Sequence, residues 1–436
     1  MKRKAIALAV GALFAAPAAH AQITFGNESI GTLQLYGKVY PQWAYAKGTG
    51  STQPGTGVST LAVGTGGLTT GAAVSDHGAR YSVDSSNSYF GIRGERRLGG
   101  SLKGIWQIEQ SVDLDFANGT DTAIDGTKAN KAGILSNRNS FAGLSHGVFG
   151  TVKLGNMDTI YKEYGDTFSM FGIASGNFVS ASNVLSQIGV GKNSLARFHE
   201  RTPNSIQYQT ADFAHMQAGV QYMPDEHKGN PGRDMNKNMW SFGVKWDTEM
   251  FYASLHREIH NDFFGASRNV ASSIANVTSA QIDAGTTGVF HSTDSATRAS
   301  GEFRFLGSQR IVLDISRLHY TERGQTANGK FLEYKKPTWA IGWDGGFGAW
   351  RAAVQYIHAG SGTCQLTGAV DCNTTGLTAT QVNIGARYRF DRQTFVYLIA
   401  SRLNNGAASA NDTWGNDDPN RGEDLKQWAL GISYSF

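Results

Sequence analysis

The chain has 436 residues, including 54 glycines, 8 prolines and 2 cysteines, and its 39 Lys and Arg nearly balance its 35 Asp and Glu. A helical membrane protein needs spans of about 20 apolar residues, and the only long apolar stretch here runs from Ala5 to Ala19, which excludes a polytopic helical bundle. An aromatic content of 11% with near-balanced charge excludes intrinsic disorder. Abundant glycine with little proline favours many strands and turns.

The N-terminus has the three parts of a secretory signal peptide. Lys2 to Lys4 are basic, Ala5 to Ala16 are apolar, and Ala19 and Ala21 supply small residues for a signal peptidase. We expect residues 1–21 to be the signal peptide and residues 22–436 to form one domain. A short anchoring helix is the disfavoured alternative, because the stretch is below spanning length. Removal of the basic start leaves a chain close to neutral, which gives no support for a nucleic-acid partner.

The rest of the chain is dominated by alternation of apolar and polar residues, which is the period of a β-strand. One face is rich in aromatic residues near the segment ends, as expected where strands meet two membrane interfaces. The pattern predicts sixteen strands, at residues 33–45, 86–97, 101–115, 134–145, 149–156, 203–210, 216–223, 238–246, 251–259, 297–305, 309–320, 337–344, 349–358, 379–390, 394–403 and 426–436. Segment 394–403 does not alternate cleanly and is placed by its position.

Connections between these segments alternate between short turns and long loops. The long loops are predicted at residues 46–85, 116–133, 157–202, 224–237, 260–296, 321–336, 359–378 and 404–425. Alternating turns and loops describe an up-and-down antiparallel barrel, since lipid leaves no water to satisfy a free strand edge. The predicted fold class is therefore all-β, a 16-stranded antiparallel transmembrane β-barrel with short periplasmic turns and long extracellular loops.

Along each strand every second residue points to the same side, and we call the polar set of alternate residues the polar parity. This set would line the interior of the barrel. It comprises Gln34, Tyr36, Lys38, Tyr40, Arg93, Glu95, Lys103, Gln107, Glu109, Ser241, Lys245, Glu302 and Arg304. Sixteen strands leave room for an aqueous channel, whereas eight would leave a filled core. The sequence therefore predicts a pore.

The two cysteines, Cys364 and Cys372, lie eight residues apart in a Gly- and Thr-rich stretch of the seventh long loop. In an oxidising compartment we expect them to form one disulfide that closes a small loop. A metal-binding pair is the disfavoured alternative, because no His or further Cys lies near them in the sequence.

Several segments resemble the general porins of Gram-negative outer membranes, most closely the betaproteobacterial branch. The resemblance lies in the runs Leu35–Lys38, Tyr89–Gly94, Leu98–Lys103, Phe141–Ser145 and Phe149–Gly155, and in the aromatic C-terminal residue Phe436, which resembles the family's assembly signal. It implies a trimer in which the third loop, about 157–202, folds inward and narrows each channel.

The resemblance also implies an arrangement of charges at that constriction. Basic residues on the wall would face acidic residues of the inward loop, and Lys38, Arg93 and Arg138 occupy the matching strand positions, with Glu163 or Asp166 on the loop. We take these five residues as the candidate pore constriction.

The predicted function is passive diffusion of small hydrophilic solutes and ions through a water-filled channel. The expected partners are two further copies of the chain, outer-membrane lipid and lipopolysaccharide, the barrel assembly machinery, and the solutes themselves. No catalysis, cofactor or metal is predicted. The alternatives are a porin that prefers anions or organic acids, an outer-membrane barrel enzyme, and an adhesin.

Overall fold

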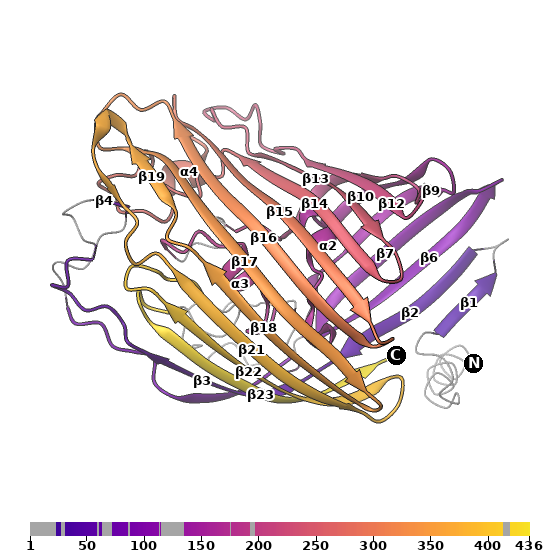
Figure 1. Cartoon of the computed structure of the whole chain (residues 1–436). Coiled ribbons are helices and arrows are strands. Elements are labelled where there is room, and N and C mark those ends of the chain that lie inside the picture. The colour runs from indigo at the N-terminus through magenta and orange to yellow at the C-terminus, as the bar shows by residue number, and fades with distance from the viewer. Residues whose placement is uncertain are drawn as a thin grey trace, which may run out of the picture.

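The computed structural model describes residues 23–27, 31–58, 61–62, 72–85, 88–112, 114, 135–174, 176–191, 197–412 and 419–436. The predicted signal peptide and the whole of the second long loop, 116–133, lie outside these residues. One antiparallel sheet of 21 segments closes on itself, and the remaining strands β4 (Leu61–Ala62) and β20 (Cys372–Asn373) pair with each other. Figure 1 shows the long tilted strands of the closed sheet.

Sixteen barrel strands account for most of the sheet, as the alternation predicted. Three of them are divided into two segments by local breaks. In chain order the segments are β2 (Gly31–Val39) with β3 (Gln42–Thr49), β5 (Arg80–Asp84) with β6 (Tyr89–Gly99), β7 (Leu102–Val112), β8 (Leu135–Asn137) with β9 (Ser140–His146), β10 (Gly150–Asp158), β11 (Arg201–Gln209), β12 (Met216–Met223), β13 (Asn238–Asp247), β14 (Phe251–Asn261), β15 (His291–Phe305), β16 (Gln309–Arg323), β17 (Phe331–Phe347), β18 (Trp350–Ala359), β21 (Ala379–Arg389), β22 (Thr394–Asn405) and β23 (Asp424–Ser435).

The two faces of the barrel follow the predicted parities. On β14, Phe251 and Leu255 are exposed on the outer face while Tyr252, Ser254 and His256 are buried inside. Strands from the whole chain contribute aliphatic and aromatic residues to the outer face in the same way, so an apolar surface faces outward and the polar parity lines the lumen.

The barrel closes where the last strand meets the first. β23 pairs with β3 from Asp424 to Gly431 and then with the end of β2, through Lys38 and Val39. The backbone break between β2 and β3 falls at Pro41, which has no N–H to donate to a ladder. Beyond the break, Gly37 and Phe436 exchange two backbone hydrogen bonds of 3.0 Å.

Several strands are longer than the alternation predicted, and most of the extra length lies at the long-loop end. β15 begins at His291 rather than 297, and β17 begins at Phe331 rather than 337. These extensions carry polar residues on both faces, so apolar alternation does not mark them. Added to the barrel are β1 (Ile23–Asn27), which pairs with β2, and β19 (Thr363–Leu366), which pairs with β17.

The irregular segment 394–403 is a barrel strand, β22, whose inner face is apolar. Phe395, Tyr397 and Ile399 are buried there beneath residues of the third long loop, including Phe171. Because the loop covers this part of the wall, the inner parity does not need to be polar, and the alternation is lost.

Candidate functional site: the lumen and its inward loop

The third long loop folds into the barrel instead of over its rim. This inward loop, residues 159–200 between β10 and β11, contains the helix α2 (Ile160–Gly165), the 3-10 turn η1 (Met170–Gly172) and the helix α3 (Ser182–Leu185). The Thr159 side chain caps α2 by accepting the Lys162 N–H at 3.2 Å. Figure 1 shows α2 and α3 within the ring of strands.

Strand side chains hold the inward loop against the wall. The Tyr161 N–H donates to Ser241 Oγ of β13 at 2.8 Å, and the Tyr252 hydroxyl of β14 donates to the Tyr164 carbonyl at 2.6 Å. On the return path, the buried Lys336 of β17 donates to the Ile188 carbonyl at 3.1 Å. The loop is thus anchored on several strands before it rejoins the wall at β11.

Glycines of the wall make room for this loop. A Cβ on Gly219 of β12 would lie 2.6 Å from Ile160 Cδ1, one on Gly342 of β17 would lie 2.8 Å from the Phe168 ring, and one on Gly385 of β21 would lie 2.8 Å from the Phe171 ring. Real Cβ atoms do not approach so closely, so a side chain at any of these positions would force the facing side chains of the loop to move.

The three predicted basic residues lie on the inner wall. Lys38 Nζ donates to the Gly172 carbonyl at the tip of η1, at 2.7 Å. Arg93 donates to Gln34 and lies over the Tyr36 ring, with Cζ 4.9 Å from its centroid.

Arg138 forms an ion pair with Glu109. The sequence analysis placed Glu109 in the lumen but did not predict this partner for it. Arg138 Nε donates to Glu109 Oε1 at 2.6 Å, and the Tyr36 hydroxyl donates to Glu109 Oε2 at 3.0 Å. Arg138 also lies over the Tyr89 ring, at 4.8 Å. Glu109 therefore orients Arg138 from the same wall.

The two predicted loop acids lie at and just beyond α2. Glu163 is exposed and accepts a hydrogen bond from Gln209 Nε2 of β11 at 2.8 Å. Asp166 is the C-cap of the helix, and removal from water raises the pKa of its carboxyl, an effect that Lys162 and Arg298 oppose. That these acids face Lys38, Arg93 and Arg138 across the narrowest passage stays a prediction.

The structure adds a basic residue that the prediction did not select. Arg387 of β21 lies beside the loop tip, with Cζ 5.6 Å from the Phe171 ring centroid and 4.8 Å from that of Phe395. The sequence signal that could have identified Arg387 as a lumen residue is its position among the alternate polar residues of 381–389. The position of η1 next to it could not be inferred from that parity.

Cys364 and Cys372 are bonded to each other in the structure, with their Cα atoms 5.8 Å apart. Both pack against an apolar cluster at the long-loop end that includes Leu61 of the first loop and Phe331 of β17. The cysteine loop is therefore joined to the rim through β19, which pairs with β17, and through β20, which pairs with β4.

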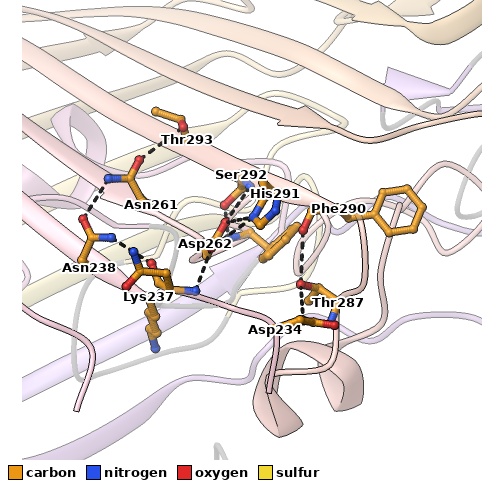
Figure 2. Close-up of polar contacts among 12 residues, drawn as sticks. Asp234, Lys237, Asn238, Asn261, Asp262, Thr287, Phe290, His291, Ser292 and Thr293 are labelled. Carbon is orange, nitrogen blue, oxygen red and sulfur yellow. Dashed lines mark hydrogen bonds and ion pairs between the residues drawn. The ribbon is translucent and has the colours of Figure 1, made fainter. Parts of the chain in front are cut away.

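Figure 2 shows a polar network that holds the fourth and fifth long loops together at the rim. Asp262 accepts hydrogen bonds from the N–H groups of Asn236 (3.0 Å) and Ser292 (3.2 Å), and its Oδ1 lies 3.1 Å from His291 Nδ1. Asp234 accepts from the Gly288 N–H at 2.6 Å. Although desolvation acts to raise the pKa of Asp234, its hydrogen bonds from Gly288 and Thr287 lower it below its usual value.

No helix in the described part of the chain is long and apolar enough to cross a membrane. Nor do the described residues bring together three or more His, Cys, Asp or Glu side chains in a way that could hold a metal ion.

A family model described as Gram-negative porin matches residues 5–408. The chain belongs to the Gram-negative porin family. This match confirms the family resemblance noted in the sequence. The porin is located in the outer membrane.

Among the curated relatives are major outer membrane proteins of Neisseria. The major outer membrane protein P.IB of Neisseria lactamica is 28% identical over 184 residues, which cover 42% of this chain and 43% of that protein. The P.IB protein of Neisseria meningitidis serogroup B is 25% identical over 350 residues, covering 78% of this chain and 86% of that protein. The match to the Neisseria lactamica protein thus spans less than half of that relative's length.

Solved structures share the fold of this porin. An anion-selective porin from Comamonas acidovorans has a TM-score of 0.61 at 18% identity, covering 93% of this chain and 100% of that one. OmpF of Salmonella typhi has a TM-score of 0.54 at 16% identity, covering 95% of this chain and 100% of that one. At these identities the likeness shows the barrel and leaves the selectivity of this chain to its own residues.

Proposed function

We propose that this porin forms a water-filled channel for passive diffusion of small hydrophilic solutes and ions across the outer membrane. The observation that carries the proposal is an inner wall of polar and charged side chains that stay partly in water. The ion pair of Lys103 and Glu95, on the inner parity of β7 and β6, keeps 35% and 42% of its side-chain surface exposed. A charged pair that stays partly in water on the inner wall is what a hydrated channel interior provides. No step of the proposal requires catalysis, which is the reason to set the enzyme alternative aside.

The test is conductance of the full-length porin in a planar lipid bilayer. We expect discrete steps that grow with salt concentration and a measurable reversal potential in a salt gradient. Buffer and detergent alone, and heat-denatured porin, are the controls. A correctly folded, heat-modifiable barrel that produces no conductance steps would contradict the channel function and favour a plugged adhesin.

A preference for anions is the second candidate. Lys38 and Arg387 beside the loop tip favour it, and the Comamonas acidovorans porin with the same fold is anion-selective. The sign of the reversal potential in the same measurement distinguishes an anion-preferring channel from an unselective one.

The proposed constriction consists of the loop at about 157–202 with Lys38, Arg93, Arg138, Glu163 and Asp166. Its support is that Lys38 contacts the loop tip and that Glu163 is exposed on the loop. Charges interact more strongly in a narrow passage with low-dielectric walls than in bulk water, so this is where charge would select ions.

The proposed mature chain is residues 22–436 after loss of a signal peptide at 1–21, and the proposed assembly is a homotrimer inserted by the barrel assembly machinery into lipid and lipopolysaccharide. Exposed aromatic rings on neighbouring outer strands, Trp43 and Tyr81, support burial of this surface in lipid or against another copy. A structural neighbour, OmpT of Vibrio cholerae, is described in a trimer form.

A further inference from the structure

A cavity of about 370 Å³ lies at the long-loop end of the wall, where β11, β12, β13 and β14 meet their loops. We call it the rim pocket. Its apolar lining consists of Pro203, Met223, Pro224, Met239 and Phe263, and charged side chains from the inward loop and the fourth long loop complete it. None of its lining residues belongs to the proposed constriction set. A cavity of this size and composition suits a small ligand that combines an apolar body with a few polar groups.

Several charged side chains that line the rim pocket already have partners. Arg201 lies 3.1 Å from Asp158, and His260 lies 2.9 Å from the buried Glu258. The Asp225 carboxylate accepts two backbone N–H groups of its own loop, at 2.8 and 2.9 Å. These side chains are therefore committed to contacts within the protein.

Lys237 differs from them because its ammonium group faces an aromatic ring and not an acid. Its Nζ lies 4.6 Å from the centroid of the Phe263 ring. Among the residues that the structure describes, no carboxylate lies within ion-pair distance of this ammonium. Removal from water is the largest influence on its pKa and lowers it. A carboxylate that entered the rim pocket would gain an ion pair with Lys237.

Glu200 is the acid that reaches the same pocket from the end of the inward loop. Arg197 Nε lies 3.4 Å from Glu200 Oε1, and 38% of the Glu200 side-chain surface is exposed. Arg197 also lies 3.4 Å from Asp412, so this one cation is shared between two acids. The Glu200 carboxylate therefore has open surface for a cationic group of a ligand.

The two charges enter the rim pocket from different places in the sheet. Glu200 directly precedes β11 and Lys237 directly precedes β13, and β12 lies between these two strands. Two strand spacings amount to about 10 Å, and within the described chain no ion pair joins the two side chains. A ligand that contacts both must carry opposite charges at its two ends.

We propose that the rim pocket binds short zwitterionic peptides with apolar side chains, of about the length of a dipeptide. Lys237 holds the terminal carboxylate, Glu200 holds the terminal ammonium, and Met223, Met239 and Phe263 contact the apolar side chains. Two extended residues span about 7 Å, and a charged contact of about 2.8 Å at each end makes this length sufficient to bridge the two groups. The inference goes beyond the proposed channel function and does not depend on it, because binding is measured without conduction.

The test is isothermal titration calorimetry of the folded, full-length porin in detergent, with dileucine as the ligand. Glycylglycine lacks the apolar side chains, N-acetyl-dileucine lacks the ammonium, and dileucine amide lacks the carboxylate. Lys237→Met and Glu200→Gln each remove one charge from the pocket. The matched controls are Lys228→Met, at an exposed position of the same loop as Lys237, and Glu249→Gln, at an exposed position of the turn between β13 and β14.

We expect dileucine to bind saturably at one site per chain, and glycylglycine to bind at least roughly tenfold more weakly because it buries no apolar side chain. Lys237→Met and Glu200→Gln should each weaken dileucine binding by roughly fivefold, the upper end of the effect of one partly exposed ion pair. Lys237→Met should leave the binding of dileucine amide unchanged, and Glu200→Gln should leave that of N-acetyl-dileucine unchanged. Both control variants should bind dileucine as the wild type does.

The inference is overturned if the folded porin shows no saturable binding of dileucine, or if glycylglycine binds as tightly. It is also overturned if Lys237→Met and Glu200→Gln bind dileucine as their controls do, or if they weaken the binding of the blocked peptides as much as that of dileucine. Heat-modifiability on a gel checks the folding of each variant, and because the two site variants alter different loops, failure of one to fold leaves the other to decide. A porin that binds dileucine but does not conduct contradicts the proposed channel function and not this inference.

Discussion

At the scale of single residues, the two acids of the inward loop differ in their surroundings. Glu163 is exposed and bonded to the neutral Gln209, whereas removal from water raises the pKa of Asp166. A carboxyl with a raised pKa holds its proton to higher pH, so the negative charge of Asp166 weakens as the pH falls. Glu163 is also the more exposed of the two carboxylates, so its charge is the better placed to act on passing ions.

This difference gives a prediction for selectivity. Neutralising Arg93 together with Arg138 should shift the reversal potential toward cations, because two fixed positive charges leave the wall. Glu163→Gln should shift it toward anions and should do so more than Asp166→Asn at slightly acidic pH. All these shifts should shrink at 1 M salt, where the screening length is about 3 Å.

The matched control is Glu226→Gln, which removes an exposed acid from the fourth long loop. If that variant moves the reversal potential as far as Glu163→Gln does, Glu163 does not lie at the constriction and the proposed set of residues is wrong.

Sequence parity identified which side chains point inward but not which of them meet. Arg93, Glu95 and Glu109 were all placed in the lumen from their period, and the structure places them there. The pairing of Glu109 with Arg138 depends on the register of β7 against β8 and β9, and nothing local in the sequence specifies that register.

At the scale of elements, the inward loop and the barrel wall have complementary surfaces where they pack together. β22 lost its alternation because the loop covers its inner face, and the wall carries glycines where η1 and the Phe168 ring approach. The strand was predictable from its position between turns. The cause of its apolar inner face was not, since it lies more than 200 residues away in the chain.

Gly385→Val tests this fit between loop and wall. The new side chain would overlap the Phe171 ring and Met170, and overpacking of this kind costs about 1–3 kcal/mol. We expect η1 to be displaced into the lumen, which should lower the single-channel conductance while the barrel still folds. Single-channel recording and heat-modifiability on a gel would measure the two effects.

Gly301→Val is the control for that variant, because a Cβ there would have only the Tyr252 carbonyl oxygen nearby, at 3.7 Å. Its conductance should equal that of the wild type. Equal conductance of Gly385→Val and Gly301→Val would show that the packing of η1 on β21 does not set the width of the channel.

At the scale of the whole molecule, the count of sixteen strands was available from alternation because each strand must present one face to lipid and one to water. The ends of the strands above the membrane, the added strands β1 and β19 and the path of the inward loop were not, because none of them is governed by that rule. Closure of the barrel was predictable only in part. The alternation predicted the strand β23, but it did not predict which residues of β2 pair with β23 at the seam that closes the barrel.

The seam leads to the last prediction, which concerns assembly. Phe436 exchanges two backbone hydrogen bonds with Gly37, and a Cβ on Gly37 would lie 2.4 Å from Cζ of the Phe436 ring, so the ring packs directly over that glycine. Since β23 meets β2 through few paired residues, loss of Phe436 removes the last pairing between these two segments and leaves strand edges there unsatisfied in lipid. Deleting Phe436 should therefore lower the yield of the folded, heat-modifiable barrel, and Gly37→Val should lower it too, because the added side chain displaces the ring without altering the C-terminus. Phe436→Tyr, which keeps an aromatic ring, should fold as the wild type does. If the deletion alone lowers the yield and Gly37→Val does not, Phe436 acts as a recognition signal and not through the seam; if neither variant lowers it, the last residue contributes nothing to assembly.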